Sequence, residues 1–102
     1  MPDFPPVLPV TVSVEEQYQL QERKALSVDT GGQSYAIVTS EPKVVTLIAD
    51  GADMQVDIQA ISADSPKLVD GASLSFTLKG AATTIYAKAV TGSGTLYIMV
   101  FK

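Results

Sequence analysis

Short runs typical of β-strands follow one another closely in the last third of the chain. Three short runs with a period-2 pattern cover residues 74–78, 84–90 and 95–101. Only Gly80-Ala-Ala separates the first run from the second, and Thr91-Gly-Ser-Gly94 separates the second from the third. Alternation places side chains on opposite faces of a strand, and short glycine turns connect antiparallel neighbours. The pattern therefore predicts three consecutive strands that pair with one another.

The last of these runs is apolar on both of its faces. One face carries Leu96, Ile98 and Val100, and the other carries Tyr97, Met99 and Phe101. Such a strand has to be covered on both faces, either by its own fold or by another molecule. A chain of 102 residues can build only one thin core layer between two sheets. We therefore predict that the second of these two sets forms an interface.

Shorter strand patterns occupy the middle of the chain. Strands are expected at residues 26–28, 34–39, 43–49 and 53–60, with glycine or proline in the gaps. The run 43–49 is apolar on both faces, which predicts a central strand. In the run 53–60, the even-numbered residues Met54, Val56, Ile58 and Ala60 are expected to face the core. Together with an alternating stretch at 10–20, the total is about eight short antiparallel strands. This spacing predicts an all-β fold, a small β-sandwich or jelly-roll-like domain.

The N-terminus has a different character. Prolines at positions 2, 5, 6 and 9 predict an extended arm over residues 1–9, followed by a single β-sandwich domain over residues 10–102. The arm is either a frayed terminus or an element that docks on a neighbouring subunit, with Phe4 and Leu8 as its anchors. The polar segment 15–24 is rich in helix formers but too poor in apolar residues for a core-facing helix, so we favour strand or linker.

Composition excludes several classes of function. The chain has no His and no Cys, which removes the usual general base, the commonest metal ligand and all thiolate chemistry. We therefore expect no enzymatic activity, no catalytic residue, no cofactor and no metal. The net charge of −4 argues against nucleic acid as a partner. No apolar run approaches the roughly 20 residues that span a bilayer, and the N-terminus has no signal-peptide pattern, so no membrane association is expected.

Three local patterns suggest chemistry but fit a structural role better. Asp50, Asp53 and Asp57 resemble an acidic calcium loop, but their spacing does not match one, and we expect a solvated strand face. Asp29-Thr-Gly31 spells the tripeptide of aspartic proteases, which need a second such carboxylate that only a dimer mate could supply here. The four tyrosines could line a sugar-binding face, although core or interface positions are the commoner explanation.

The C-terminal residues also resemble small structural proteins of tailed bacteriophages. Those proteins have a strand leading to Gly-Ala-Thr-x-Ile and a following strand that ends Gly-Ser-Gly-Thr-Leu-Tyr-Val, similar to Gly80-Ala-Ala-Thr-Thr-Ile and Thr91-Gly-Ser-Gly-Thr-Leu-Tyr-Ile here. Lys24-Ala-Leu-Ser-Val and Lys43-Val-Val-Thr-Leu look like their first strands, so the similarity covers roughly residues 24–101. The proline arm and the segment 15–24 depart from the family pattern.

The resemblance implies a virion accessory protein. We expect a capsid decoration protein, made in the host cytoplasm and located in the virion, that forms a homo-oligomer, with a trimer as the working symmetry. Its interface residues would be Phe4, Leu8, Tyr97, Met99 and Phe101, and its partners would be copies of itself and other virion proteins. The alternative is a tail- or adhesin-associated module that binds a cell-surface glycan or protein.

Overall fold

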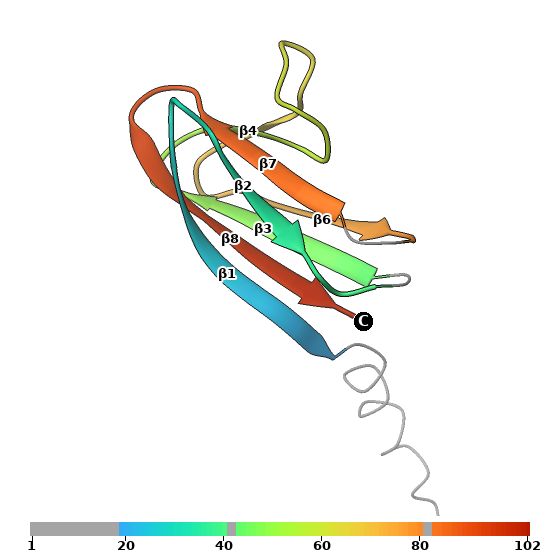
Figure 1. Ribbon diagram of the computed structural model, residues 1–102. Coiled ribbons are helices and arrows are strands. Elements are labelled where there is room, and N and C mark those ends of the chain that lie inside the picture. Colours follow the sequence, from blue (N-terminus) through green and yellow to red (C-terminus); the bar gives the residue numbers. More distant parts are fainter. Residues whose placement is uncertain (1–18, 41–42, 81–82) are drawn as a thin grey trace, which may run out of the picture.

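Two antiparallel sheets stack as the layers of a β-sandwich (Figure 1). The computed structural model describes residues 19–40, 43–80 and 83–102. These residues form eight strands: β1 (Leu20–Asp29), β2 (Gln33–Ile37), β3 (Lys43–Asp50), β4 (Met54–Asp57), β5 (Lys67–Leu68), β6 (Ser73–Leu78), β7 (Thr83–Ala89) and β8 (Ser93–Phe101). The first sheet has the order β1-β8-β3-β6 and the second the order β2-β7-β4-β5. The all-β prediction is confirmed, whereas the arm at 1–9 lies outside the described residues.

The last three strands do not pair with one another, so that part of the prediction is wrong. β6 pairs with β3, β7 pairs with β2 and β4, and β8 pairs with β1 and β3. Each short turn carries the chain across to the opposite sheet, helped by positive φ angles at Gly80 (90°) and Gly92 (67°). Crossing lets consecutive strands bury their apolar faces against the same core from both sides.

β1 is much longer than the three residues expected. It begins at Leu20, and its whole length pairs with β8, from Leu20 opposite Phe101 to Asp29 opposite Ser93, with a register irregularity between Leu20 and Glu22. Residues 20–24 are therefore strand, not helix. β1 lies at the edge of its sheet, so most of its side chains are exposed and a polar sequence suffices.

β4 is shorter than predicted, and Ile58 and Ala60 are exposed instead of facing the core. The side chain of Asp57 ends the strand: its Oδ1 accepts hydrogen bonds from the backbone N–H groups of Ile58 (2.7 Å) and Gln59 (3.3 Å). A local side-chain acceptor of this kind competes with the sheet ladder for backbone donors. The chain then forms a loop that projects at the top of Figure 1.

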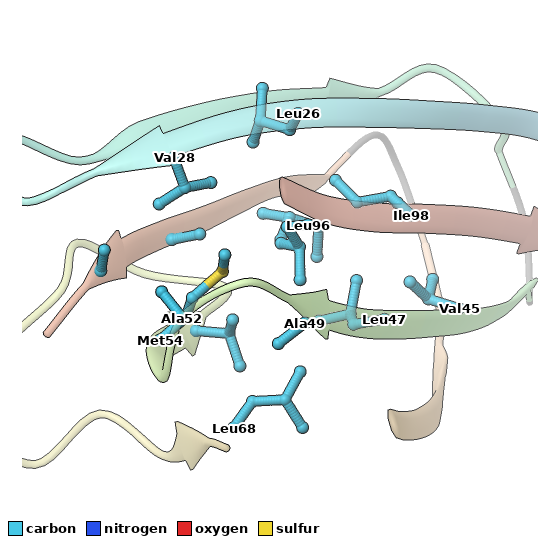
Figure 2. Close-up of a cluster of buried hydrophobic side chains, with 14 of the residues drawn as sticks. Leu26, Val28, Val45, Leu47, Ala49, Ala52, Met54, Leu68, Leu96 and Ile98 are labelled. Carbon is cyan, nitrogen blue, oxygen red and sulfur yellow. The ribbon is translucent and has the colours of Figure 1, made fainter. Parts of the chain in front are cut away.

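The core lies between the sheets and takes side chains from both (Figure 2). Leu96, Ile98 and Val100 of β8 are at most 1% exposed, which confirms one of the two faces predicted for that strand. Lys43, the first residue of β3, is also buried, and its Nζ lies 3.5 Å from the carbonyl oxygen of Gly80. Within residues 19–40, 43–80 and 83–102, no helix has the length and apolarity to cross a bilayer.

Candidate interaction surface

The outward face of the first sheet is apolar at its centre. On β8, Tyr97 is 41% exposed, and Met99 and Phe101 are half-buried. The neighbouring strand β3 contributes half-buried Val44 opposite Phe101 and half-buried Ile48 opposite Tyr97. Because residues opposite each other on paired strands lie side by side, Val44 and Ile48 extend the β8 row at its two ends, and the five side chains form one patch around Thr46, which lies opposite Met99. We call it the apolar face.

Polar residues surround the apolar face on both flanks. On the β1 side, the charged Arg23 lies opposite Met99 in the strand register. On the β6 side, the hydroxyl group of the exposed Ser75 lies 2.9 Å from the hydroxyl group of Thr46. An apolar centre with a polar rim is the usual anatomy of a protein–protein interface.

A shallow hollow of about 430 Å³ lies on the β1 side of the apolar face. It is lined by Arg23, Lys24, Ala25, Ile48, Tyr97, Ile98 and Met99. A side chain of a partner could fit into this hollow. The two basic residues Arg23 and Lys24 contribute to its lining. This shape suits a protein partner better than a small polar ligand, because the floor offers few hydrogen-bonding groups.

The structure brings together three of the five predicted interface residues. Tyr97, Met99 and Phe101 share one face, while Phe4 and Leu8 lie outside the described residues. The sequence prediction missed that β3 completes the patch with Val44 and Ile48. A signal for them existed in the run 43–49, because its apolar character on both faces already required a second cover.

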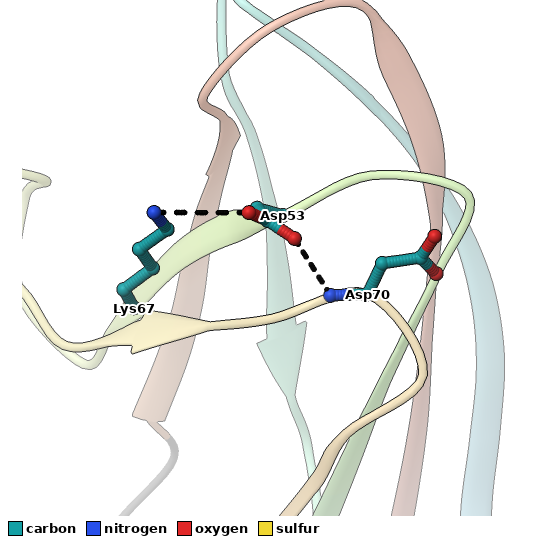
Figure 3. Close-up of polar contacts among 3 residues, drawn as sticks. All are labelled: Asp53, Lys67 and Asp70. Carbon is teal, nitrogen blue, oxygen red and sulfur yellow. Dashed lines mark hydrogen bonds and ion pairs between the residues drawn. The ribbon is translucent and has the colours of Figure 1, made fainter.

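Asp53, one of the acidic residues identified in the sequence, connects two segments of the chain. Asp53 accepts a hydrogen bond from the backbone N–H of Asp70 (2.9 Å) and lies 3.7 Å from the Lys67 ammonium (Figure 3). Asp70 in turn accepts from the N–H of Gly51 (2.8 Å). These contacts tie the turn after β3 to the segment after β5. No group of three potential metal ligands occurs among the residues that the structure describes.

Asp57 and Asp29 likewise act on nearby backbone and side chains. The Ser65 hydroxyl donates to Asp57 Oδ2 at 2.8 Å, and that hydrogen bond is the main reason that the pKa of the Asp57 carboxyl is lowered. Asp29 Oδ1 accepts from the N–H of Gly31 at 2.8 Å and so closes the turn between β1 and β2. Both carboxylates are thus explained by turn formation.

The most elaborate polar cluster surrounds Glu22, near the start of β1. Its carboxylate accepts hydrogen bonds from the Tyr35 hydroxyl (2.7 Å), from the N–H groups of Val38 (3.2 Å) and Thr39 (2.7 Å), and from the Thr39 hydroxyl. Burial alone would raise the pKa of the carboxyl, but these donors outweigh it and lower the pKa. The cluster fixes the segment after β2 to the opposite sheet.

The same cluster changes the ionisation of its tyrosine. The hydrogen bond to Glu22, followed by burial and the charge of Glu22, raises the pKa of Tyr35 to about 12. The Tyr35 hydroxyl therefore remains a donor across the neutral range. A carboxylate whose oxygens are occupied by four donors is suited to holding two sheets together, not to proton transfer.

Comparison with known proteins adds no assignment: no protein-family model fits the chain, and no curated protein or solved structure matches it.

Proposed function

We propose that the protein is a non-enzymatic structural protein of a tailed-phage virion, and that it decorates and stabilises the capsid as a homo-oligomer that bridges shell subunits. The observation that carries this proposal is the apolar face, with Tyr97, Met99 and Phe101 beside Val44 and Ile48. The resemblance of the C-terminal strands to phage structural proteins supports the same class.

An uncovered apolar face favours association for a physical reason. Burying apolar surface releases roughly 25 cal/mol per Å², and contiguous exposed apolar patches commonly mark interaction sites. The five side chains of the apolar face are held on two paired strands, so their positions are fixed before a partner arrives. A rigid surface loses little conformational entropy on binding, which suits repeated contacts in a symmetric shell.

The assembly part is tested by molar mass in solution at high micromolar concentration. We expect an oligomer for the native chain and a shift towards monomer for Tyr97→Lys, because the new charge would have to be buried in the interface. Val38→Lys is the matched control, since Val38 is 76% exposed and lies away from the apolar face. A native chain that remains monomeric at these concentrations would remove the main support for the proposal.

The shell part is tested with assembled capsids from a tailed phage. We expect the chain to bind intact shells in a co-sedimentation assay, and we expect deletion of residues 1–9 to weaken binding while the circular dichroism spectrum of the sandwich is retained. Equal binding by Tyr97→Lys and by the native chain would show that the apolar face is not used on the shell.

A second candidate function is a glycan-binding module of a tail or adhesin. The observation that favours it is a hollow of about 480 Å³ beside the second sheet, lined in part by Gln33, Ser34, Tyr86 and Lys88. Its lining is more polar than that of the hollow beside the apolar face. A tyrosine ring next to amide and hydroxyl groups is a combination that binds sugars. Glycan-array binding that is lost in Tyr86→Ala would favour this function over decoration.

A further inference from the structure

β6 is an edge strand whose own sequence has no feature that would block the addition of another strand. Among the described strands, β6 pairs only with β3, in an unbroken register from Lys43 opposite Leu78 to Ile48 opposite Ser73. Its sequence Ser-Leu-Ser-Phe-Thr-Leu has no charge and no proline, the features with which proteins usually block an exposed edge. The opposite edge strand of this sheet, β1, has Glu22, Arg23 and Lys24 as well as a register irregularity.

An apolar pocket opens directly beneath this edge. It has a volume of about 200 Å³ and is lined by Leu47, Val56, Asp57, Ile58, Pro66, Leu74, Phe76 and Ile85. The pocket exists because β5, the edge strand of the second sheet, has only two residues and leaves the inward side chains of β6 partly uncovered. Leu74 is 37% exposed and Ile58 is 44% exposed at its mouth. An apolar cavity of ~150 Å³ can hold benzene, so this pocket has room for an aliphatic side chain.

The chain contains a segment whose pattern matches that of β6. In residues 10–14, Val10, Val12 and Val14 alternate with Thr11 and Ser13. β6 alternates in the same way, with leucine or phenylalanine towards the core and serine or threonine outwards. A strand with this sequence beside β6 would extend both rows, valines towards the pocket and hydroxyls outwards. Neither sequence carries a charge, so pairing would bury no ion.

Geometry assigns the segment to a second copy of the chain. Gln19 is fixed at the start of β1 by two backbone hydrogen bonds with Lys102 (3.1 and 3.0 Å). A strand added to β6 would lie four strand spacings from β1, or about 19 Å. The five residues from Val14 to Gln19 span at most about 18 Å when fully extended. The segment therefore falls short of β6 in its own molecule, and it would also have to run parallel, the less stable arrangement.

We propose that residues 10–14 of one copy add as an antiparallel strand to the free edge of β6 in a neighbouring copy, with one valine side chain in the pocket beneath. This inference rests on the proposed function in one respect: it requires that copies of the chain associate. Backbone hydrogen bonds would supply the affinity, and the pocket would select an apolar side chain at alternate positions.

The test uses single cysteines in this cysteine-free chain. Val12→Cys and Ile58→Cys full-length chains, purified separately and distinguishable by mass, are mixed under mild oxidation, and disulfide-linked heterodimers are quantified by mass spectrometry. Val12→Cys mixed with Val38→Cys is the control for random collision, because Val38 is exposed away from the pocket. We expect the first mixture to give at least about tenfold more heterodimer, the ratio that corresponds to about 1.4 kcal/mol of preference.

A second variant checks that the pocket causes the effect. Adding Leu74→Lys to the Ile58→Cys chain places a charge at the pocket mouth and should reduce the yield to that of the collision control, with the fold checked by circular dichroism. Equal yields in the two mixtures would overturn the proposal. So would a chain that carries both Val12→Cys and Ile58→Cys and forms the disulfide only within itself. Because the cross-link reports on the segment and Tyr97→Lys reports on the apolar face, failure of one proposal is distinguishable from failure of the other.

Discussion

Replacing Glu22 by Gln should loosen the connection between the two sheets. The carboxylate accepts hydrogen bonds from four donors: the Tyr35 hydroxyl, the Val38 and Thr39 N–H groups and the Thr39 hydroxyl. Glutamine keeps one acceptor oxygen and turns an NH₂ group towards donors. Hydrogen bonds to a charged group contribute ~1.5–3 kcal/mol when buried, and solvent reduces that for a half-buried group. We therefore expect a loss of about 1–2 kcal/mol, or ~5–10 °C in Tm.

The pH dependence of this loss gives a sharper test. The pKa of the Glu22 carboxyl is lowered from its ordinary value of 4.5, so its stabilising effect is complete above pH 4.5 and disappears as the pH falls through the lower native value. The pKa of Tyr35 is raised from 10.0 to about 12, so the stabilisation from its hydrogen bond is complete below pH 10 and is lost as the pH rises towards 12. The difference between Glu22→Gln and the native chain should therefore be largest between these limits.

The assay is urea unfolding of both chains at a series of pH values from 3 to 11, followed by circular dichroism. Asp64→Asn, which removes one negative charge from an exposed loop, is the control for net charge. Tyr35→Phe should remove part of the same stabilisation, and the double variant with Glu22→Gln should lose less than the sum of the two single variants. The reasoning is refuted if Glu22→Gln is as stable as the native chain at pH 7, or if its loss of stability does not shrink as the pH falls below 4.5.

Two further predictions concern a glycine of β8 and a hydrogen bond in the loop after β4. Gly94→Ala should lower the free energy of unfolding in urea by about 2–3 kcal/mol, because an added Cβ would lie 2.6 Å from the carbonyl oxygen of Asp50. Gly71→Ala is the control: its Cβ would meet no atom within 4 Å, and it should cost about 1 kcal/mol through the φ of +85° alone. Equal losses in the two variants would contradict the close approach at Gly94. Ser65→Ala removes the donor to Asp57 and should raise the pKa of that carboxyl in an NMR titration, and an unchanged pKa would show that this hydrogen bond is not the main cause of the shift.

The strand pattern could be read from the sequence where the core dictates it. Alternation placed Leu96, Ile98 and Val100 on one face of β8, and these side chains are buried. It failed where a partner strand or a local hydrogen bond decides the boundary. β1 extends to Leu20 because β8 provides a ladder along its full length, and β4 stops at Asp57 because that side chain captures the next backbone donors.

The residues of the apolar face could likewise be predicted from the sequence only in part. Tyr97, Met99 and Phe101 were predicted as a set because the second apolar face of their strand needed a cover. Their neighbours Val44 and Ile48 could not be placed beside them, since strand order within a sheet is not encoded in the period of a single strand. The pocket under β6 could not be predicted from the sequence either, because it depends on how short β5 is in the other sheet.

The sequence by itself determined that this chain forms short strands with two distinct faces, and that the last strand has an apolar face in excess of what one core needs. Only the tertiary structure decided that consecutive strands cross between sheets, that β3 joins β8 to complete the apolar face, and that β6 forms the edge of the described sheet, above a pocket. The reason is physical: alternation is a local property of the backbone, whereas pairing and cover are settled by contacts between residues far apart in the chain.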